Sequence, residues 1–264
     1  MYEQWIVDVR HDDPTVRYEA TQKLGASNDG RAIDPLIGLL PDANAKVQYA
    51  AFSGLIKLGA SQAAEPMVAM LITDFKSRVW ALLKLNIGLR LRMGLLEFVQ
   101  PGDQTIAQQV TTALDSESMD EAQRAYLIRL LGKTADTAKV DMLLELLGEP
   151  SEALQSAAAE SLGWMRDNRA VNPLIALLGD TRDTVREVAA EALGRIGDTS
   201  VFDVMLDMLN DKNEWVRRAA AVALGELGDR RAVDPLVLAL QDHSNIVQDA
   251  AFDSLKKFSY NNVM

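Results

Sequence analysis

Residues 216–229 read VRRAAAVALGELGD, and this stretch defines a unit that recurs along most of the chain. With Val216 as offset 0, apolar or small residues occupy offsets 0, 3, 4, 7, 8 and 11, the spacing of an α-helix that is buried along one side. Arg217, Arg218 and Glu226 fall on the opposite side. The stretch therefore predicts an amphipathic helix that packs against neighbours of its own kind.

The same pattern predicts eight such helices, separated by steps of 31, 32, 44, 31, 31, 31 and 31 residues. Their offset-0 residues are Val16, Val47, Val79, Gln123, Leu154, Val185, Val216 and Val247. A constant period in this range is typical of a stacked repeat array. Offset 9 is glycine in six of the eight helices, which costs helix stability, and we expect the missing side chain to allow neighbouring helices to approach closely.

A second type of helix follows each of these, as in RAIDPLIGLL (residues 31–40), RAVNPLIALL (169–178) and RAVDPLVLAL (231–240). Proline stands in the first turn, where a missing amide donor is tolerated. We call the proline-type helix the A helix and the VRxAA-type helix the B helix. Together they predict an all-α fold, a right-handed α-solenoid of about eight helix pairs.

The predicted organisation is a single repeat domain over residues 1–264. Residues 1–30 form a cap repeat, because Glu19 and Lys23 stand at offsets 3 and 7, where interior repeats are mostly apolar. The irregular repeat lies near residues 79–122, where the 44-residue step exceeds the period by 13 (44 − 31). We place the insertion at 91–105 and the regular repeats at 106–258. The insertion either changes the curvature of the stack or forms a partner-binding bulge.

VREVAAEALGRIGD (residues 185–198) and VRRAAAVALGELGD, each paired with an RAVxPLxxLL segment, resemble the short HEAT-like repeats of the phycobilin-lyase (E/Z) type. They are also similar to the consensus of designed proteins built on those repeats. The resemblance implies the α-solenoid fold and a range of functions. Members of this group include adaptors, proteins that attach, isomerise or detach linear tetrapyrroles on phycobiliproteins or assist phycobilisome turnover, and a related group that excises alkylated DNA bases.

The amino-acid composition narrows the range of functions that the resemblance implies. The chain has 27 Lys and Arg against 38 Asp and Glu, a net charge of −11, which disfavours nucleic acid and anionic membranes as partners. It has no cysteine, and its two histidines, His11 and His243, are 232 positions apart (243 − 11), so no metal site is predicted. The most apolar run is interrupted by charges, which excludes a membrane span. A cytoplasmic location is expected.

No catalytic constellation is evident. Arginines at offset 1 (Arg17, Arg186 and Arg217) and the aspartates at offset 13 that follow the B helices are predicted to form a structural ladder of hydrogen bonds between neighbouring turns.

We expect partner binding on the concave side of the stack, lined by the B helices, with offsets 1, 2, 5, 6, 9 and 10 exposed. Aromatic side chains beside cations at these positions have the composition of an interface hot region. The predicted contact residues are Arg17, Tyr18, Tyr49, Phe52, Trp80, Lys84, Arg124, Arg129 and Trp164.

These observations predict a scaffold or adaptor, not an enzyme, that binds another protein in a concave groove without a cofactor. The alternative, implied by the resemblance, is a subunit of a phycobilin lyase or isomerase, or a phycobilisome assembly or degradation factor. Only that alternative requires a linear tetrapyrrole, and the groove would hold it. The sequence leaves the oligomeric state open.

Overall fold

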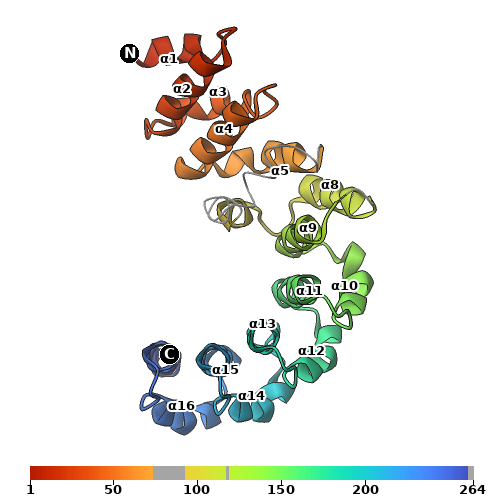
Figure 1. The fold of residues 1–264 in the computed structure, drawn as a ribbon. Helices are drawn as coiled ribbons and strands as arrows, with labels where there is room; N and C mark the ends of the chain where they lie inside the picture. Colours follow the sequence, from red (N-terminus) through yellow and green to blue (C-terminus); the bar gives the residue numbers. More distant parts are fainter. Residues whose placement is uncertain (74–92, 117–118, 261–264) are drawn as a thin grey trace. The chain divides into compact units, whose positions relative to one another are not determined.

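The computed structural model describes residues 1–73, 93–116 and 119–260, and within these ranges every regular element is an α-helix or a short 3-10 helix (Figure 1). The predicted all-α solenoid of repeated helix pairs is confirmed. The chain separates into two compact units, residues 1–123 and 124–264. The arrangement of residues 1–264 as one domain stays a prediction. Among the described residues, no helix is both long and apolar enough to cross a membrane.

The B helices begin where the repeat pattern places them, two residues before each offset-0 position. They are α2 (Pro14–Gly25), α4 (Ala45–Lys57), α9 (Glu121–Thr134), α11 (Glu152–Met165), α13 (Asp183–Ile196), α15 (Glu214–Leu227) and α17 (Asn245–Tyr260). The B helix predicted around Val79 lies outside the described residues. Most of these helices are capped as expected; for example, the Asn213 side chain accepts a hydrogen bond from the Trp215 amide at 2.9 Å.

The A helices are shorter, and a short α1 (Tyr2–Asp8) precedes the first B helix. The A helices are α3 (Ile33–Ile37), α5 (Ala64–Thr73), α8 (Gln104–Leu114), α10 (Val140–Leu146), α12 (Val171–Leu177), α14 (Phe202–Met208) and α16 (Val233–Ala239). The offset-13 aspartates end the B helices as predicted and cap the 3-10 turn that leads into the A helix. Asp229, for example, accepts a hydrogen bond from the Arg231 amide at 2.9 Å. Pro235 then falls in the first turn of α16, where no donor is lost.

In the second unit, α11, α13, α15 and α17 pack in a row, with the A helices along its outer side (Figure 1). The row is set by very close contacts between B helices. A Cβ added to Gly194 would lie 2.7 Å from the Cβ of Ala223, and one added to Gly163 would lie 2.8 Å from the Cα of Ala192. The first unit has the same contact, because a Cβ on Gly25 would lie 2.6 Å from the Cα of Gly54. The predicted role of the repeated glycine is confirmed at these positions.

The irregular region is described only in part. Residues 93–98 are helical, the chain turns at Pro101 and Gly102, and α8 begins at Gln104. Gly102 has φ of +92°, a conformation that favours glycine. Whether this insertion binds a partner stays a prediction.

The glycine contact can be tested with Gly194→Ala. Alanine is favoured over glycine in a free helix by about 1 kcal/mol, but here the added methyl meets α15, so we expect the unfolding free energy to fall by about 1–3 kcal/mol. Urea unfolding followed by circular dichroism measures the change. Gly179→Ala is the control, because its methyl would meet only an ordinary contact at 3.6 Å. Equal stability of the two variants would contradict the close-packing account.

Candidate protein-binding face

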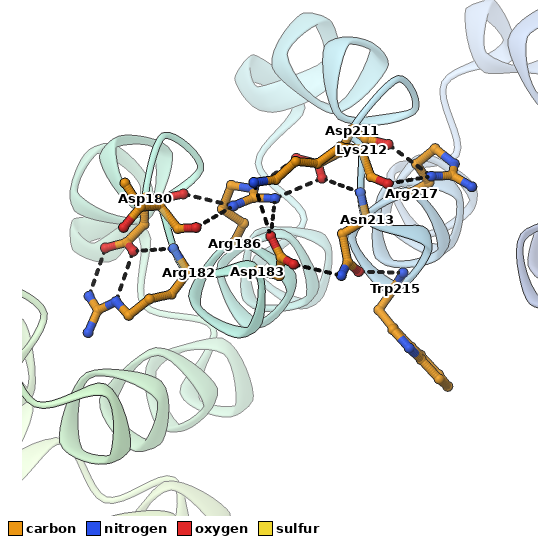
Figure 2. Close-up of polar contacts among 10 residues, drawn as sticks. Asp180, Arg182, Asp183, Arg186, Asp211, Lys212, Asn213, Trp215 and Arg217 are labelled. Atoms are coloured by element: carbon orange, nitrogen blue, oxygen red, sulfur yellow. Dashed lines mark hydrogen bonds and ion pairs between the residues drawn. The ribbon is translucent and has the colours of Figure 1, made fainter.

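Two of the offset-1 arginines, Arg186 and Arg217, are buried, and they link successive turns (Figure 2). Arg186 contacts Asp211 through Nε at 2.8 Å and Nη2 at 2.9 Å, and its Nη1 donates to the carbonyl of Asp180 at 2.9 Å. Arg217 repeats the arrangement one helix further on, with Nε 2.8 Å from Asp242. The predicted ladder therefore exists at these positions.

Two details of the sequence predictions are wrong, one about the ladder and one about the contact residues. The ladder aspartates are not the offset-13 residues, which cap the 3-10 turns, but residues 25 positions after each arginine, in the turn before the next B helix. In addition, Arg17 is not available on an exposed face, because its Nε contacts Asp42 at 2.8 Å and only 16% of its side chain is exposed. The Arg17 guanidinium donates hydrogen bonds to backbone carbonyls of its own turn and to a carboxylate of the next turn. Because these partners lie between the two turns, the side chain is held there and is mostly covered.

The ladder stays charged at neutral pH. Burial alone would raise the pKa of Asp211, but the hydrogen bonds from Arg186 hold it below its usual value. The hydrogen bond from Arg217 likewise holds the pKa of Asp242 below its usual value, against the opposing effect of burial. Fully formed ion pairs between turns fit a role in stacking, which leaves binding to other side chains.

The predicted exposure of offset 5 on the B helices is wrong. Phe52 was expected on the concave surface, but its side chain is completely buried, and so are Ala190 and Ala221 at the same offset of later helices. An interior B helix is contacted by B helices on both sides as well as by its A helix, so its buried arc is wider than the apolar stripe alone indicates. Phe252, at offset 5 of α17, is 55% exposed because no described helix follows it.

Offsets 2, 6 and 10 remain exposed or half-buried in most repeats, and we call this surface of the B helices the B face. In the first unit it includes Tyr18 and Tyr49, both half-buried. The Tyr18 hydroxyl accepts a hydrogen bond from Gln22 at 2.8 Å. Burial raises the pKa of Tyr49, and an electrostatic interaction with Tyr18 raises it further. Two of the predicted aromatic residues therefore lie on the B face of the first unit.

The B face of the second unit is a network of opposite charges around one indole ring. Its members are Arg129, Lys133, Glu160, Trp164, Glu187, Glu191, Arg195, Arg218, Val222, Glu226, Asp249, Asp253 and Lys257. Arg129 Nε contacts Glu160 at 2.7 Å, and Glu191 accepts from both Arg195 at 3.0 Å and Arg218 at 3.2 Å. The Arg129–Glu160 pair joins α9 to α11 and the Arg218–Glu191 pair joins α15 to α13, whereas Arg195 and Glu191 are both on α13.

Trp164, expected to be exposed at offset 10, is half-buried on this face, and its contact with a partner stays a prediction. The ammonium of Lys133 lies 4.6 Å from the centre of its ring, and the guanidinium carbon of Arg195 lies 6.0 Å away. Arg129 also lies where it was expected. Arg124 is half-buried, with its Nε enclosed and without a hydrogen bond among the described residues. Trp80 and Lys84 lie outside the described residues.

Glu187 is the least satisfied charge of the B face. Burial raises its pKa, and the nearby carboxylates of Glu191 and Glu160 raise it further, while Arg218 acts in the opposite direction. Glu187 has no hydrogen bond or ion pair among the residues that the structure describes. Its ionised form is therefore held at a cost in the free protein, and a cation from outside would relieve this cost.

Sequence reasoning missed Glu187, Lys133 and Arg195 as parts of the site, because it gave most weight to aromatic residues beside cations. It also missed Trp215, which is 46% exposed at offset −1, just outside the template. A signal existed, since the other described B helices have smaller residues at that offset. No group of three or more potential metal ligands occurs among the described residues.

With this geometry established, the comparison with known proteins decides the family. A model of HEAT repeats matches residues 4–85, 107–194 and 174–256. The chain belongs to the HEAT-repeat family. No curated protein matches it.

Solved structures of other chains align with it. An engineered protein aligns with a TM-score of 0.50 at 20% identity, over 98% of this chain and 78% of that one, which shows the fold. The complex of CpcE and CpcF of phycocyanin lyase from Nostoc sp. PCC7120 aligns with a TM-score of 0.49 at 18% identity, over 98% and 94% of the two chains. Human deoxyhypusine hydroxylase in complex with glycerol gives a TM-score of 0.42 at 22% identity, over 86% and 84%.

The reassignment of Phe52 predicts a specific loss of stability. Phe52→Ala removes a completely buried ring, so the unfolding free energy should fall by about 3–5 kcal/mol. Tyr49→Ala removes a half-buried ring from the B face and should cost less. Chemical unfolding of both variants measures the difference. If Phe52→Ala were as stable as Tyr49→Ala, the burial of Phe52 between α4 and its neighbours would be contradicted.

The raised pKa of Glu187 predicts that its replacement by glutamine stabilises the protein in a pH-dependent way. Because the pKa of Glu187 is raised in the folded protein, its favourable contribution is complete below its unfolded value near 4.3 and is lost as the pH rises through the folded pKa. Glu187→Gln should therefore raise the Tm at pH 7 but not at pH 4. Glu226→Gln, which breaks the pair with Lys257, is the matched control and should give no such gain. A Glu187→Gln Tm at pH 7 equal to or below the wild-type value would contradict the assignment.

Proposed function

We propose that this HEAT-repeat protein is a scaffold that binds another protein along its B face. Membership of the HEAT-repeat family supports this role at the level of the fold. Because a fold alone does not specify a function, the side chains of the B face must supply the evidence for binding.

The observation that carries the proposal is the indole of Trp164 between two cations. The other described B helices of the second unit carry a charged residue at offset 10, namely Lys133, Arg195, Glu226 and Lys257, and all of them stack without an aromatic ring there. The ring of Trp164 is therefore not required by the repeat. A partly exposed tryptophan flanked by Lys133 and Arg195 provides an amphipathic anchor with charges around it, the composition of an interface hot spot.

The charge network supports the same reading. Ion pairs such as Arg129–Glu160 and Arg218–Glu191 hold long side chains in defined positions before a partner arrives. Preorganised side chains lose less conformational entropy on binding. The unpaired carboxylate of Glu187 adds a position where a partner's cation gains a charge-assisted bond.

The tetrapyrrole-linked alternative stays a prediction from the resemblance. An absorbance titration with a linear tetrapyrrole separates the two functions, because a shifted and saturable band would favour the alternative. The scaffold proposal expects no such band.

The proposal is tested by affinity capture from an extract of the source organism, comparing immobilised wild-type protein with Trp164→Ala. Loss of a hot-spot residue costs about 2 kcal/mol or more, so retention of the specific partner should fall at least about tenfold. Leu238→Ala is the control, because Leu238 is 69% exposed on the outer helix α16. Circular dichroism should show that both variants remain folded.

Two results would contradict the proposal. One is that the wild-type protein retains no protein above the level of an unrelated matrix. The other is that retention survives Trp164→Ala and Tyr49→Ala but is lost in Leu238→Ala, which would move the interface to the outer helices.

A further inference from the structure

A groove of about 350 Å³ lies on the B face between α15 and α17. Val222, Ile246 and Ala250 supply apolar lining, and Arg218, Asp249 and Asp253 supply charged groups. The volume is at the lower end of the range for ligand pockets, about 300–1,000 Å³. The groove therefore suits one or two side chains of a docked segment.

Trp215 extends the apolar surface beside this groove. It stands three residues before Arg218 and seven before Val222, so the three share one face of α15. Its side chain is 46% exposed and points away from the arginine ladder (Figure 2). Only its backbone amide takes part in the capping bond to Asn213, so the indole itself is left for other contacts.

The groove's cations are already neutralised from within the chain. Arg218 pairs with Glu191 at 3.2 Å, and Lys257 pairs with Glu226 at 3.4 Å. Asp253 is bound by Lys256 at 2.8 Å. Asp249 is exposed and has no hydrogen bond or ion pair among the described residues. The charge that the groove leaves unmatched is therefore negative.

We infer that this groove binds a protein segment that inserts an apolar side chain between α15 and α17 and places an adjacent arginine or lysine against Asp249. The inference rests on the proposed function, because the groove is part of the B face. The exposed indole of Trp215 offers a second contact for the same segment, by stacking or cation–π attraction. An acidic segment would instead meet Asp249 and Asp253 and would have to displace Glu191 from Arg218.

The test is selection of a random 12-residue peptide library displayed on phage against the immobilised full chain. Selected sequences should combine an apolar residue with a neighbouring arginine or lysine. One of them, made synthetically with a fluorescent label, is then measured by anisotropy against purified variants. Trp215→Ala and Asp249→Lys should each weaken its binding at least about tenfold, and both changes are at exposed positions that the stack does not use.

Asp203→Lys is the matched control, because it makes the same charge change at an exposed position on α14 and should leave the affinity unchanged. Enrichment of acidic peptides, or of none at all, would overturn the inference. It would also be overturned by peptides whose binding is lost with Trp164→Ala but not with Trp215→Ala. That last outcome leaves the proposed function standing, whereas failure of the capture experiment removes the function itself.

Discussion

The structure depends on the close approach of consecutive B helices at a glycine that recurs in most turns. Gly25, Gly163, Gly194 and Gly225 each meet a small residue 29 positions later, and a single methyl group at any of them would collide with the next helix. Two backbones can approach this closely only where side chains are nearly absent. This contact fixes the register in which each helix meets its successor.

Other contacts follow from that register. The arginine ladder requires the guanidinium of one turn to reach the carboxylate 25 residues later, and it does so with nearly the same distances at Arg17, Arg186 and Arg217. The positions on each B helix therefore have different roles. Offsets 1, 5 and 9 are taken up by stacking in the interior repeats, and offsets 2, 6 and 10 remain for contact with other molecules.

The sequence predicted the fold well because the fold is repeated. The start of each described B helix, the capping aspartates and the glycine contacts all follow from a 31-residue period in which each copy supports the others. The same regularity limited the prediction of the site. Phe52 has the spacing of an exposed residue within its own helix, and its burial comes from a neighbouring helix that one amphipathic pattern does not reveal. Similarly, the aspartate partner of Arg186 lies in another turn, where local sequence gives no pairing.

We propose that the B face, and not the outer helices, contacts the partner. Hydroxyl-radical footprinting with mass spectrometry tests this directly, because it reports the solvent accessibility of individual side chains in the free and partner-bound protein. The account predicts that oxidation of Trp164 and Trp215 falls on binding while that of Leu238 on α16 is unchanged. Protection of Leu238, with Trp164 and Trp215 oxidised as in the free protein, would contradict it.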